Sequence, residues 1–423
     1  MKYQDLKIAV IGMGYVGLPL AVEFAKKIKV FGFDINSERI IQLKKGYDIT
    51  NEVSKNNITK LKKIKFTSTL SELKDCKVYI VTVPTPVDNH NKPDLVPLIN
   101  ATYLVSRVIK ENDIIIYEST VYPGATEELC GPILEKETGL KLNKNLFLGY
   151  SPERINPGDK KKKITDIIKI TSGSNLKTSN FIKKLYSLII KAGVHQTDSI
   201  KIAEAAKVIE NAQRDLNIAF VNELSLIFKK MKISTEKVLK AAETKWNFIS
   251  FRPGLVGGHC IGVDPYYLTY KSKKIGHNPK IILAGRNLND QMSSHVFKDI
   301  LNIIKTKKTL KKNYKVLIMG LTFKENCPDT RNSKVLDLFN LFKKKNFLIS
   351  SYDPNHKLWN KTFKKKFNVI ENIKNQKFDL VIIAVKHKKF IKIKNKISKL
   401  CNSDGFIYDL KYLLPEDSNS YRL

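Results

Sequence analysis

The chain has 423 residues, of which 42% are hydrophobic, and a formal net charge of +35 at pH 7. This length and composition predict two or three domains with ordinary hydrophobic cores. No apolar run approaches the roughly 20 residues that a membrane-spanning helix needs. The first residues lead into a strand-like run without the charged and apolar regions of a signal peptide. We therefore expect neither a membrane span nor a secretion signal.

The positive charge raises the question of nucleic-acid binding. Of the 75 basic residues, however, only eight are arginine and 67 are lysine, dispersed along the whole chain. Nucleic-acid readers usually need arginine for bidentate contacts to bases. The pattern therefore favours a solvated, lysine-rich surface that attracts anionic substrates, and we expect no nucleic-acid partner.

Cysteine is sparse, and the five residues form no closely spaced pair and no Cys/His spacing suited to zinc. We expect free thiols in a reducing compartment, which indicates a cytoplasmic protein, and no bound metal. The five are Cys76, Cys130, Cys260, Cys327 and Cys401.

The N-terminal segment carries the pattern of a dinucleotide-binding turn. An apolar run at Lys7–Ile11 leads into a G-x-G-x-x-G motif, and a helical pattern follows. The glycines permit a tight turn and close approach of a pyrophosphate, which the helix N-terminus then stabilises. The motif consists of Gly12, Met13, Gly14, Tyr15, Val16 and Gly17.

A second predicted strand, Val30–Phe33, ends at Asp34, which is 17 residues after the last glycine of the motif. An acid at this place can bind the adenosine ribose hydroxyls and repel a 2′-phosphate, so the spacing favours NAD over NADP. Two alternatives stay open: Asp34 could cap the next helix, and Arg39 could pair with a phosphate.

Three more strands are predicted at 78–83, 114–117 and 146–150. Ligands of a doubly wound sheet bind at the carboxyl ends of its strands, so the residues that follow these strands are candidates for a site. Ordinary turn chemistry explains each of them equally well when it is taken alone. The candidates are Pro84, Thr85, Ser119, Thr120, Glu153 and Arg154.

A helical pattern without glycine or proline runs from about residue 201 to 230. Lys207 and Asn211 lie four residues apart and therefore share one face of this helix. Alanine, valine and isoleucine surround Lys207 in the sequence, so we expect it to be enclosed rather than solvated. A helix of this length also suits a domain bridge or a subunit interface. Shorter helices are predicted at 235–244 and 280–305.

A loop rich in glycine and proline, residues 250–267, contains Cys260 and, four residues later, Asp264. Glycine lets the backbone approach a ligand closely, and loops on a rigid scaffold often carry function. A buried structural cysteine is the alternative interpretation. Because the loop lies between two helical stretches, we expect Cys260 to be a nucleophile.

Residues 314–423 repeat the order of the N-terminal half. One predicted strand ends at Gly320 and the next ends at Asp353, as the earlier strands end at glycine and at Asp34. This order predicts a second Rossmann-like unit without the full glycine motif. The predicted strands span 315–319, 347–352, 380–385 and 406–408.

The turn after Gly320 resembles a nucleotide-phosphate site. It contains Phe323 and Lys324, and Asp329 and Arg331 follow. A helix cap with a first-turn surface residue explains Asp329 and Arg331 equally well.

Together these motifs resemble the nucleotide-sugar 6-dehydrogenase family, which includes UDP-glucose dehydrogenase. They occur in the order GMGYVG, VPTP, ESTV, SPER, AKVIEN, GGHCIGVDP and GLTFKENCPDTRNS, and the resemblance covers about residues 5–415. It implies an α/β fold with two Rossmann-like, doubly wound parallel-sheet domains, joined by a long central helix and a helical dimerisation domain. The implied domains are 1–195 for NAD, 196–308 for dimerisation and the catalytic cysteine, and 309–423 for the UDP-sugar.

The resemblance also implies a four-electron oxidation of a UDP-sugar's C6 alcohol to a carboxylate, with NAD as cofactor and a homodimer formed through the central helix. Cys260 would hold the aldehyde as a thiohemiacetal and then as a thioester. Lys207 and Asn211 would stabilise negative charge on oxygen, and Asp264 would manage protons through water.

By resemblance, Thr120 positions a water and Glu153 acts as the base in thioester hydrolysis. The further contacts that the resemblance implies are Arg154, Arg252, Gly257, Phe323 and Lys324 for the substrate, and Arg331 for NAD.

Two departures put glucose in doubt. UDP-glucose enzymes usually carry Pro-Lys-Asp after the cysteine, whereas this chain places Val263 before Asp264. The acid expected shortly after Glu153 is replaced by the segment Asn156-Pro157-Gly158. The pattern RPGLVGGHCIGVDPYYL resembles members that oxidise UDP-N-acetylhexosamines for capsule or O-antigen synthesis. We expect UDP-N-acetylglucosamine or UDP-N-acetylgalactosamine, with UDP-N-acetylmannosamine and UDP-glucose as alternatives.

Two other classes of protein compete with this interpretation. A two-electron dehydrogenase, or a decarboxylating one of the 6-phosphogluconate type, needs no nucleophilic thiol. A non-enzymatic nucleotide binder needs none of the proposed catalytic set. The number of NADH formed per sugar separates the three classes, at two, one and none.

Overall fold

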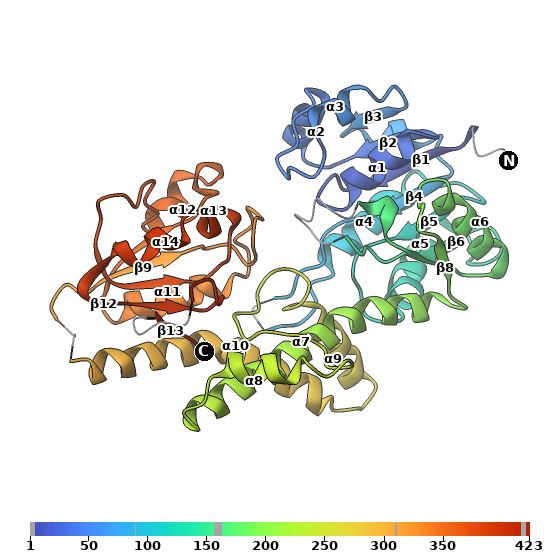
Figure 1. Cartoon of the computed structure of the whole chain (residues 1–423). Coiled ribbons are helices and arrows are strands. Elements are labelled where there is room, and N and C mark those ends of the chain that lie inside the picture. The colour runs from blue at the N-terminus through green and yellow to red at the C-terminus, as the bar shows by residue number, and fades with distance from the viewer. Residues whose placement is uncertain (1–4, 89, 156–162, 309–310, 416–419) are drawn as a thin grey trace. The chain divides into compact units, whose positions relative to one another are not determined.

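The computed structural model describes all 423 residues except 1–4, 89, 156–162, 309–310 and 416–419. The segment Asn156-Pro157-Gly158 thus lies outside the described residues. Contacts within the chain define two compact units (Figure 1): the first comprises residues 1–210 and 266–278, and the second residues 211–265 and 279–423. Across the described part of the chain, no helix is long and apolar enough to cross a membrane. The three-domain division at 195 and 308 stays a prediction.

The first unit is built on an eight-stranded sheet in the order β3-β2-β1-β4-β5-β6-β7-β8. Neighbouring strands are parallel, except that β6 and β7 pair antiparallel. The order 3-2-1-4-5-6 is that of doubly wound sheets, which bind ligands at the carboxyl ends of their strands. The strands are β1 (Lys7–Ile11), β2 (Lys29–Phe33), β3 (Ile64–Thr67), β4 (Val78–Val81), β5 (Ile114–Tyr117), β6 (Phe147–Tyr150), β7 (Lys169–Gly173) and β8 (Val194–Gln196).

The predicted strands of this unit correspond to β1, β2, β4, β5 and β6. The sequence analysis did not predict β3, β7 and β8. Their sequences, IKFT, KITSG and VHQ, contain no two consecutive apolar residues, so none forms an apolar run.

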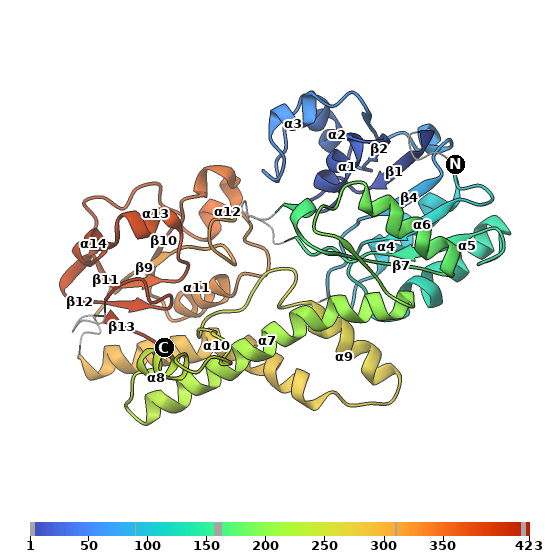
Figure 2. The same ribbon diagram turned by 45° about the vertical axis from the view of Figure 1, so that its right-hand side comes forward.

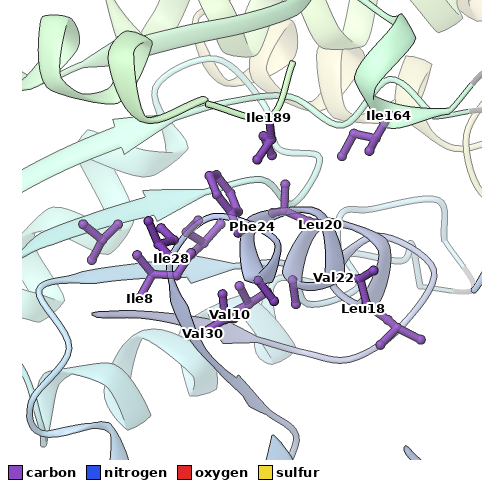
Figure 3. Packing of buried hydrophobic residues seen from close by; sticks show 14 of the residues in the cluster. Ile8, Val10, Leu18, Leu20, Val22, Phe24, Ile28, Val30, Ile164 and Ile189 are labelled. Atoms are coloured by element: carbon purple, nitrogen blue, oxygen red, sulfur yellow. The ribbon is translucent and has the colours of Figure 1, made fainter. Parts of the chain in front are cut away.

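Helices cover the faces of the first sheet. Figure 3 shows one face, where Leu20 and Phe24 of α1 extend toward Ile189, while Val10 of β1 and Val30 of β2 lie on the other side of the helix in the same buried cluster. On the opposite face, the Thr102 hydroxyl of α4 lies 2.9 Å from the hydroxyl of Tyr117 on β5. The helices are α1 (Gly17–Ala25), α2 (Ser37–Lys44), α3 (Lys55–Thr59), α4 (Val96–Ser106), α5 (Gly131–Thr138) and α6 (Leu176–Ser187).

The second unit contains a five-stranded parallel sheet in the order β10-β9-β11-β12-β13. Both faces are buried: Ile318 of β9 packs with α10 and α11, whereas Met319 packs with Phe390 of α13 and Ile397 of α14 (Figure 2). The predicted strands at 315–319, 347–352 and 380–385 correspond to β9, β10 and β11, and the one at 406–408 covers only the end of β12. Strand β13, with two residues, was not predicted. The strands are β9 (Lys315–Met319), β10 (Leu348–Tyr352), β11 (Phe378–Ile383), β12 (Cys401–Asp409) and β13 (Ser420–Tyr421).

The helices of this sheet are α11 (Lys334–Lys344), α12 (Lys361–Lys366), α13 (Lys388–Lys392) and α14 (Lys394–Ile397). Four more helices lie between the two sheets in the sequence, namely α7 (Ile200–Lys230), α8 (Thr235–Ala242), α9 (Asp264–Lys274) and α10 (Lys280–Thr306). The predicted helices at 201–230, 235–244 and 280–305 are confirmed. Helix α9 was not predicted, because its first residues belong to the glycine-rich loop motif.

A buried ion pair ties α10 to the second-unit part of α7. The Arg286 guanidinium is 2% exposed and donates to Asp215 and Asp290, both at 2.6 Å. The Asn289 amide donates to Asp215 at 2.7 Å. A buried carboxylate needs this compensation for its lost hydration. The predicted α/β architecture, with two Rossmann-like sheets and a long helix, is confirmed.

Candidate active site

The G-x-G-x-x-G turn of the first unit is shaped by the space around its glycines. Gly12 has a φ of +97°, and its N–H donates to Phe33 O at 2.8 Å. A Cβ on Gly17 would lie 1.8 Å from Gly12 O, so no larger residue fits there. A Cβ on Gly14 would have no neighbour within 4 Å. That open space before α1 is where a pyrophosphate approaches the backbone, so the turn fits a dinucleotide.

Asp34 and Arg39 both hold this turn, but in different ways. Asp34 accepts N–H groups from Met13 at 2.8 Å and from Asn36 at 2.9 Å, and its side chain stays partly exposed. The Arg39 guanidinium is 8% exposed, donates to Met13 O at 2.9 Å and pairs with Asp48 at 2.8 Å. Arg39 is therefore committed to the protein, and Asp34 keeps the partial exposure that its predicted contact with a ribose requires.

The loops after β4 and β5 are tied to each other. The Thr85 hydroxyl donates to Thr120 O at 2.7 Å, and the Ser119 hydroxyl donates to Val83 O at 2.6 Å. The Tyr267 hydroxyl donates to Thr85 O at 2.8 Å. The first of these contacts holds the backbone carbonyl of Thr120, and the residue remains partly exposed.

Glu204, which the sequence analysis did not single out, anchors the loop that follows Thr120. Its carboxylate is fully buried and accepts backbone N–H groups from Gly124 and Thr126. Burial raises the pKa of Glu204 to about 7. It lies one turn before Lys207 on α7, and Lys207 is 7% exposed, so the expectation that Lys207 is enclosed is confirmed. An acid among alanines was the available signal for Glu204.

Glu153 and Arg154 follow β6. Glu153 is 8% exposed and accepts the backbone N–H of Arg154 at 2.6 Å. The Arg154 guanidinium pairs with Glu210 of α7 at 2.8 Å and donates to Ile168 O at 2.9 Å. Part of the Arg154 guanidinium is therefore engaged within the unit, and its side chain stays 29% exposed.

In the second unit, Cys260 closes a turn that starts α9. Its carbonyl accepts N–H groups from Val263 at 3.0 Å and from Asp264 at 2.8 Å, while its side chain is partly exposed. Asp264 is 1% exposed, and the Asn211 amide donates to its carboxylate at 2.6 Å. An acid in the first turn of a helix is stabilised by the helix dipole. The structure thus brings Asn211 and Asp264 together beside the backbone of the thiol.

The cysteine loop packs directly on the turn that follows β9. A Cβ on Gly257 would lie 2.4 Å from Asn332 O, and one on Gly258 would lie 2.6 Å from the Phe323 ring. Gly258 has a φ of +90°, and its N–H donates to Asn332 O at 3.3 Å. The paired glycines are therefore required by this close approach, which joins two motifs that lie far apart in the sequence.

His259 and Arg331 share one carboxylate in this contact. His259 Nε2 lies 3.1 Å from Asp329 Oδ2, and Arg331 donates to the same group at 2.6 Å. Burial alone would raise the pKa of Asp329, but the hydrogen bonds from His259 and Arg331 lower it well below its usual range. Two further residues were predicted to contact the substrate. Arg252 pairs with Glu243, and Lys324 Nζ lies 6.0 Å from the centre of the Phe323 ring.

The turn after β9 repeats the geometry of the dinucleotide turn. Gly320 has a φ of +90° and donates to Tyr352 O at 2.8 Å, and Asp353 accepts the Leu321 N–H at 2.8 Å. Asp353, however, is fully buried and pairs with His387 at 3.2 Å. Asn326 N–H donates to His387 Nδ1 at 3.0 Å, so His387 also holds the segment beyond Lys324. The sequence analysis missed His387, which lies far from this turn in the chain.

Comparison with known proteins identifies the family of this chain. The sequence matches the NAD binding domain of the UDP-glucose/GDP-mannose dehydrogenase family over residues 6–190, its central domain over 201–291 and its UDP binding domain over 317–416. The chain belongs to this family. It is therefore an NAD-dependent nucleotide-sugar dehydrogenase that acts on a UDP-sugar, as the sequence analysis expected.

Three relatives illustrate the similarity. A Pseudomonas aeruginosa protein named UDP-N-acetyl-D-glucosamine 6-dehydrogenase is 52% identical over 99% of this chain and 100% of its own. Protein CapL of Staphylococcus aureus is 48% identical over 97% of this chain and 96% of its own. The solved structure of a UDP-D-ManNAc dehydrogenase from Pyrococcus horikoshii superposes with a TM-score of 0.88 at 29% identity, covering 99% of this chain and 98% of that one.

We predict that the dehydrogenase prefers NAD⁺ to NADP⁺ by at least about tenfold in kcat/KM, or ~1.4 kcal/mol. The physical reason is that Asp34 repels a 2′-phosphate while Asp48 neutralises Arg39. Asp34→Ala should reduce the preference, whereas Asp75→Ala, an acid with a 71% exposed side chain, should not. Equal wild-type efficiencies with the two cofactors would show that Arg39 outweighs Asp34.

We predict that Gly258→Ala lowers kcat by about tenfold or more, because its Cβ would push the cysteine loop away from Phe323. The control is Gly276→Ala, which has a φ of +83° but no neighbour within 4 Å of its Cβ. Both variants carry the ~1–2 kcal/mol cost of the left-handed conformation, and only the first carries the clash. Equal activities of the two variants, measured by NADH absorbance, would contradict the proposed docking contact.

Proposed function

We propose that this enzyme oxidises the C6 hydroxyl of UDP-N-acetylglucosamine to the carboxylate, forming UDP-N-acetylglucosaminuronate with two NAD⁺ reduced. The observation that carries the proposal is the partly exposed thiol of Cys260 on a glycine loop that packs on the Phe323-Lys324 turn. The choice of sugar is supported by relatives of that name at 52% and 49% identity over the full chain. UDP-N-acetylgalactosamine, which differs at C4, is the first alternative.

The chemistry follows from the thiol. Bound NAD⁺ accepts a hydride in each of the two oxidation steps. Between them, the Cys260 sulfur attacks the C6 aldehyde to give a thiohemiacetal, whose oxidation leaves a thioester. Water hydrolyses the thioester, so one alcohol, two NAD⁺ and one water give one carboxylate, two NADH and three protons. Covalent capture retains the aldehyde until the second oxidation is complete.

The proposed roles of the other residues fit their environments. Lys207 and Asn211 stabilise negative charge on the C6 oxygen, and the bond from Asn211 to Asp264 fixes the orientation of the amide. Asp264 exchanges protons with water. Thr120 positions the hydrolytic water, and Glu153 removes its proton. Each role rests on the family resemblance together with the geometry of the separate units.

Substrate and cofactor contacts are proposed on the same basis. Gly12–Gly17, Asp34, Pro84, Thr85, Ser119, Thr120 and Arg331 contact NAD. Glu153, Arg154, Lys207, Asn211, Arg252, Gly257, Phe323 and Lys324 contact the UDP-sugar.

We also propose a homodimer formed through α7. Four of its apolar residues, Ile202, Ile209, Phe220 and Ile227, are 44–56% exposed. They are separated by seven, eleven and seven residues, which places them on one stripe of an α-helix. An exposed apolar stripe of this length is typical of a protein interface. The five cysteines are free, which suits the proposed cytoplasmic location. The proposed use of the product in surface polysaccharide synthesis is supported by the similarity to the protein named CapL.

The test of the proposed function is a panel of UDP-N-acetylglucosamine, UDP-N-acetylgalactosamine, UDP-N-acetylmannosamine and UDP-glucose. We expect two NADH per sugar and the highest kcat/KM with the first, with UDP-glucose poorer by about a hundredfold, or ~2.7 kcal/mol. One NADH per sugar would favour a two-electron dehydrogenase, and no NADH a non-enzymatic binder. A highest efficiency with UDP-glucose would reject the sugar assignment alone.

In the same assay, Cys260→Ser should bind NAD normally and nearly stop turnover, because serine oxygen cannot form the thioester. Cys401→Ser, a cysteine 8% exposed at the start of β12, is the control and should turn over normally. Normal steady-state oxidation by Cys260→Ser would reject the covalent mechanism.

For the dimer, we expect Ile209→Asp combined with Phe220→Asp to shift the wild-type dimer to a monomer in analytical ultracentrifugation, because charge in an apolar interface is costly. Leu358→Asp is the control, since Leu358 is 58% exposed in the second unit and away from α7. A dimer that survives the double substitution, or a monomeric wild type, would contradict the interface.

A further inference from the structure

A buried lysine lies between two glutamates in the first unit. Lys169 of β7 is 2% exposed, and its Nζ lies 2.7 Å from Glu118 Oε2 and 3.6 Å from Glu153 Oε2. Glu118 follows β5 and is 2% exposed. One ammonium thus serves two carboxylates, and one of these is the proposed base of thioester hydrolysis.

The far side of this group is fixed by Tyr186 of α6. The Tyr186 hydroxyl donates to Glu118 Oε1, and Lys169 Nζ lies 5.5 Å from the centre of the Tyr186 ring. The ammonium therefore has a carboxylate and an aromatic face as fixed partners. These contacts hold Lys169 in place without the help of Glu153.

Glu153 presents one oxygen to Lys169 and the other to the backbone. Its Oε1 accepts N–H groups from Arg154 and Ile155. Its buried Oε2 accepts no hydrogen bond among the described residues, and Lys169 is its ion-pair partner there. The orientation of the carboxylate is thus determined by the backbone on one side and by charge on the other.

The charges do not balance, because two carboxylates and one ammonium carry a net charge of −1. Burial raises the pKa of Glu118, Lys169 lowers it and the charge on Glu153 raises it again. Two acids therefore share one cation in a place of low dielectric, and each limits the stabilisation that Lys169 gives to the other. Among the described residues, Arg154, which follows Glu153 directly, pairs with Glu210.

We infer that Lys169 is a positioning residue that keeps Glu153 ionised and oriented as the base. Glu118 pairs with the same ammonium and so limits how strongly Lys169 lowers the basicity of Glu153. The inference rests on the proposed function, in which Glu153 removes a proton from the hydrolytic water. Lys169 itself touches neither substrate nor cofactor in this assignment.

The experiment is the pH dependence of kcat with UDP-N-acetylglucosamine and NAD⁺, together with the pre-steady-state release of NADH. Lys169→Met should lower kcat at neutral pH by about tenfold or more and move its acid limb up by about one pH unit or more. The rapid burst of two NADH per active site should remain, because oxidation precedes hydrolysis. The thioester should then accumulate and add the mass of the uronosyl nucleotide to the intact protein.

Companion variants separate charge from structure. Lys169→Arg should restore most of kcat and the wild-type acid limb, because it returns a cation. Glu118→Gln should move the acid limb to lower pH, because Lys169 is then left to Glu153 alone. Lys77→Met is the matched control, since Lys77 pairs with buried Asp113 at 2.9 Å elsewhere in the unit, and it should leave the limb unchanged.

The outcomes distinguish this inference from the proposed function. If wild type yields no more than one NADH per sugar, the proposed function fails first. If wild type yields two and folded Lys169→Met or Glu118→Gln keeps the wild-type acid limb, the inference about Lys169 is wrong. The inference about Lys169 would also be overturned if, in both Lys169→Arg and Lys169→Met, the rate of the NADH burst falls by the same factor as kcat. The lysine would then act in the oxidation steps, before hydrolysis.

Discussion

The structure depends on one backbone constraint that occurs twice. The first strand of each sheet ends at a glycine with positive φ, Gly12 or Gly320, and the aspartate after the second strand accepts the next N–H. The two aspartates then differ in environment. Asp34 remains partly exposed, as a ribose contact would require, whereas Asp353 is fully buried and paired with His387. The same geometry thus supports cofactor binding in one unit and a rigid substrate turn in the other.

A second close approach gives the thiol its place. Cys260 stands on a loop whose paired glycines leave no room for side chains against Phe323 and Asn332. Gly257 approaches the Asn332 backbone, whereas Gly258 approaches the Phe323 ring. The contact between two backbones fixes position more strictly than side-chain packing, because it allows no rotamer change. The turn at Cys260 O then leads directly into α9, so Asp264 is set at a helix N-terminus, where its charge is favoured.

The sequence revealed the features whose signal is local. Strands buried on both faces appeared as apolar runs, and α7 appeared as a long segment without glycine or proline. The contacts that support the site could not be predicted in this way. Lys169, Glu118 and His387 each pair with a residue more than 30 positions away, and β7 is too polar to be recognised as a strand. Only the folded sheet makes these charges neighbours.

Most arginines of this strongly basic chain form ion pairs within the protein. Six of the eight arginines pair with carboxylates of their own unit: Arg39, Arg154, Arg252, Arg286, Arg331 and Arg422. Arginine suits such pairs because its planar group is weakly hydrated and binds carboxylates bidentately. Part of each guanidinium is therefore already engaged, and a ligand phosphate must use the N–H groups that remain or displace a carboxylate. For Arg39, which is buried, the displacement would leave Asp48 without its cation. For Arg331, whose side chain is 57% exposed, a ligand can approach from solvent, and Asp329 would keep its contact with His259, so Arg331 is the arginine of this set best placed to bind a phosphate.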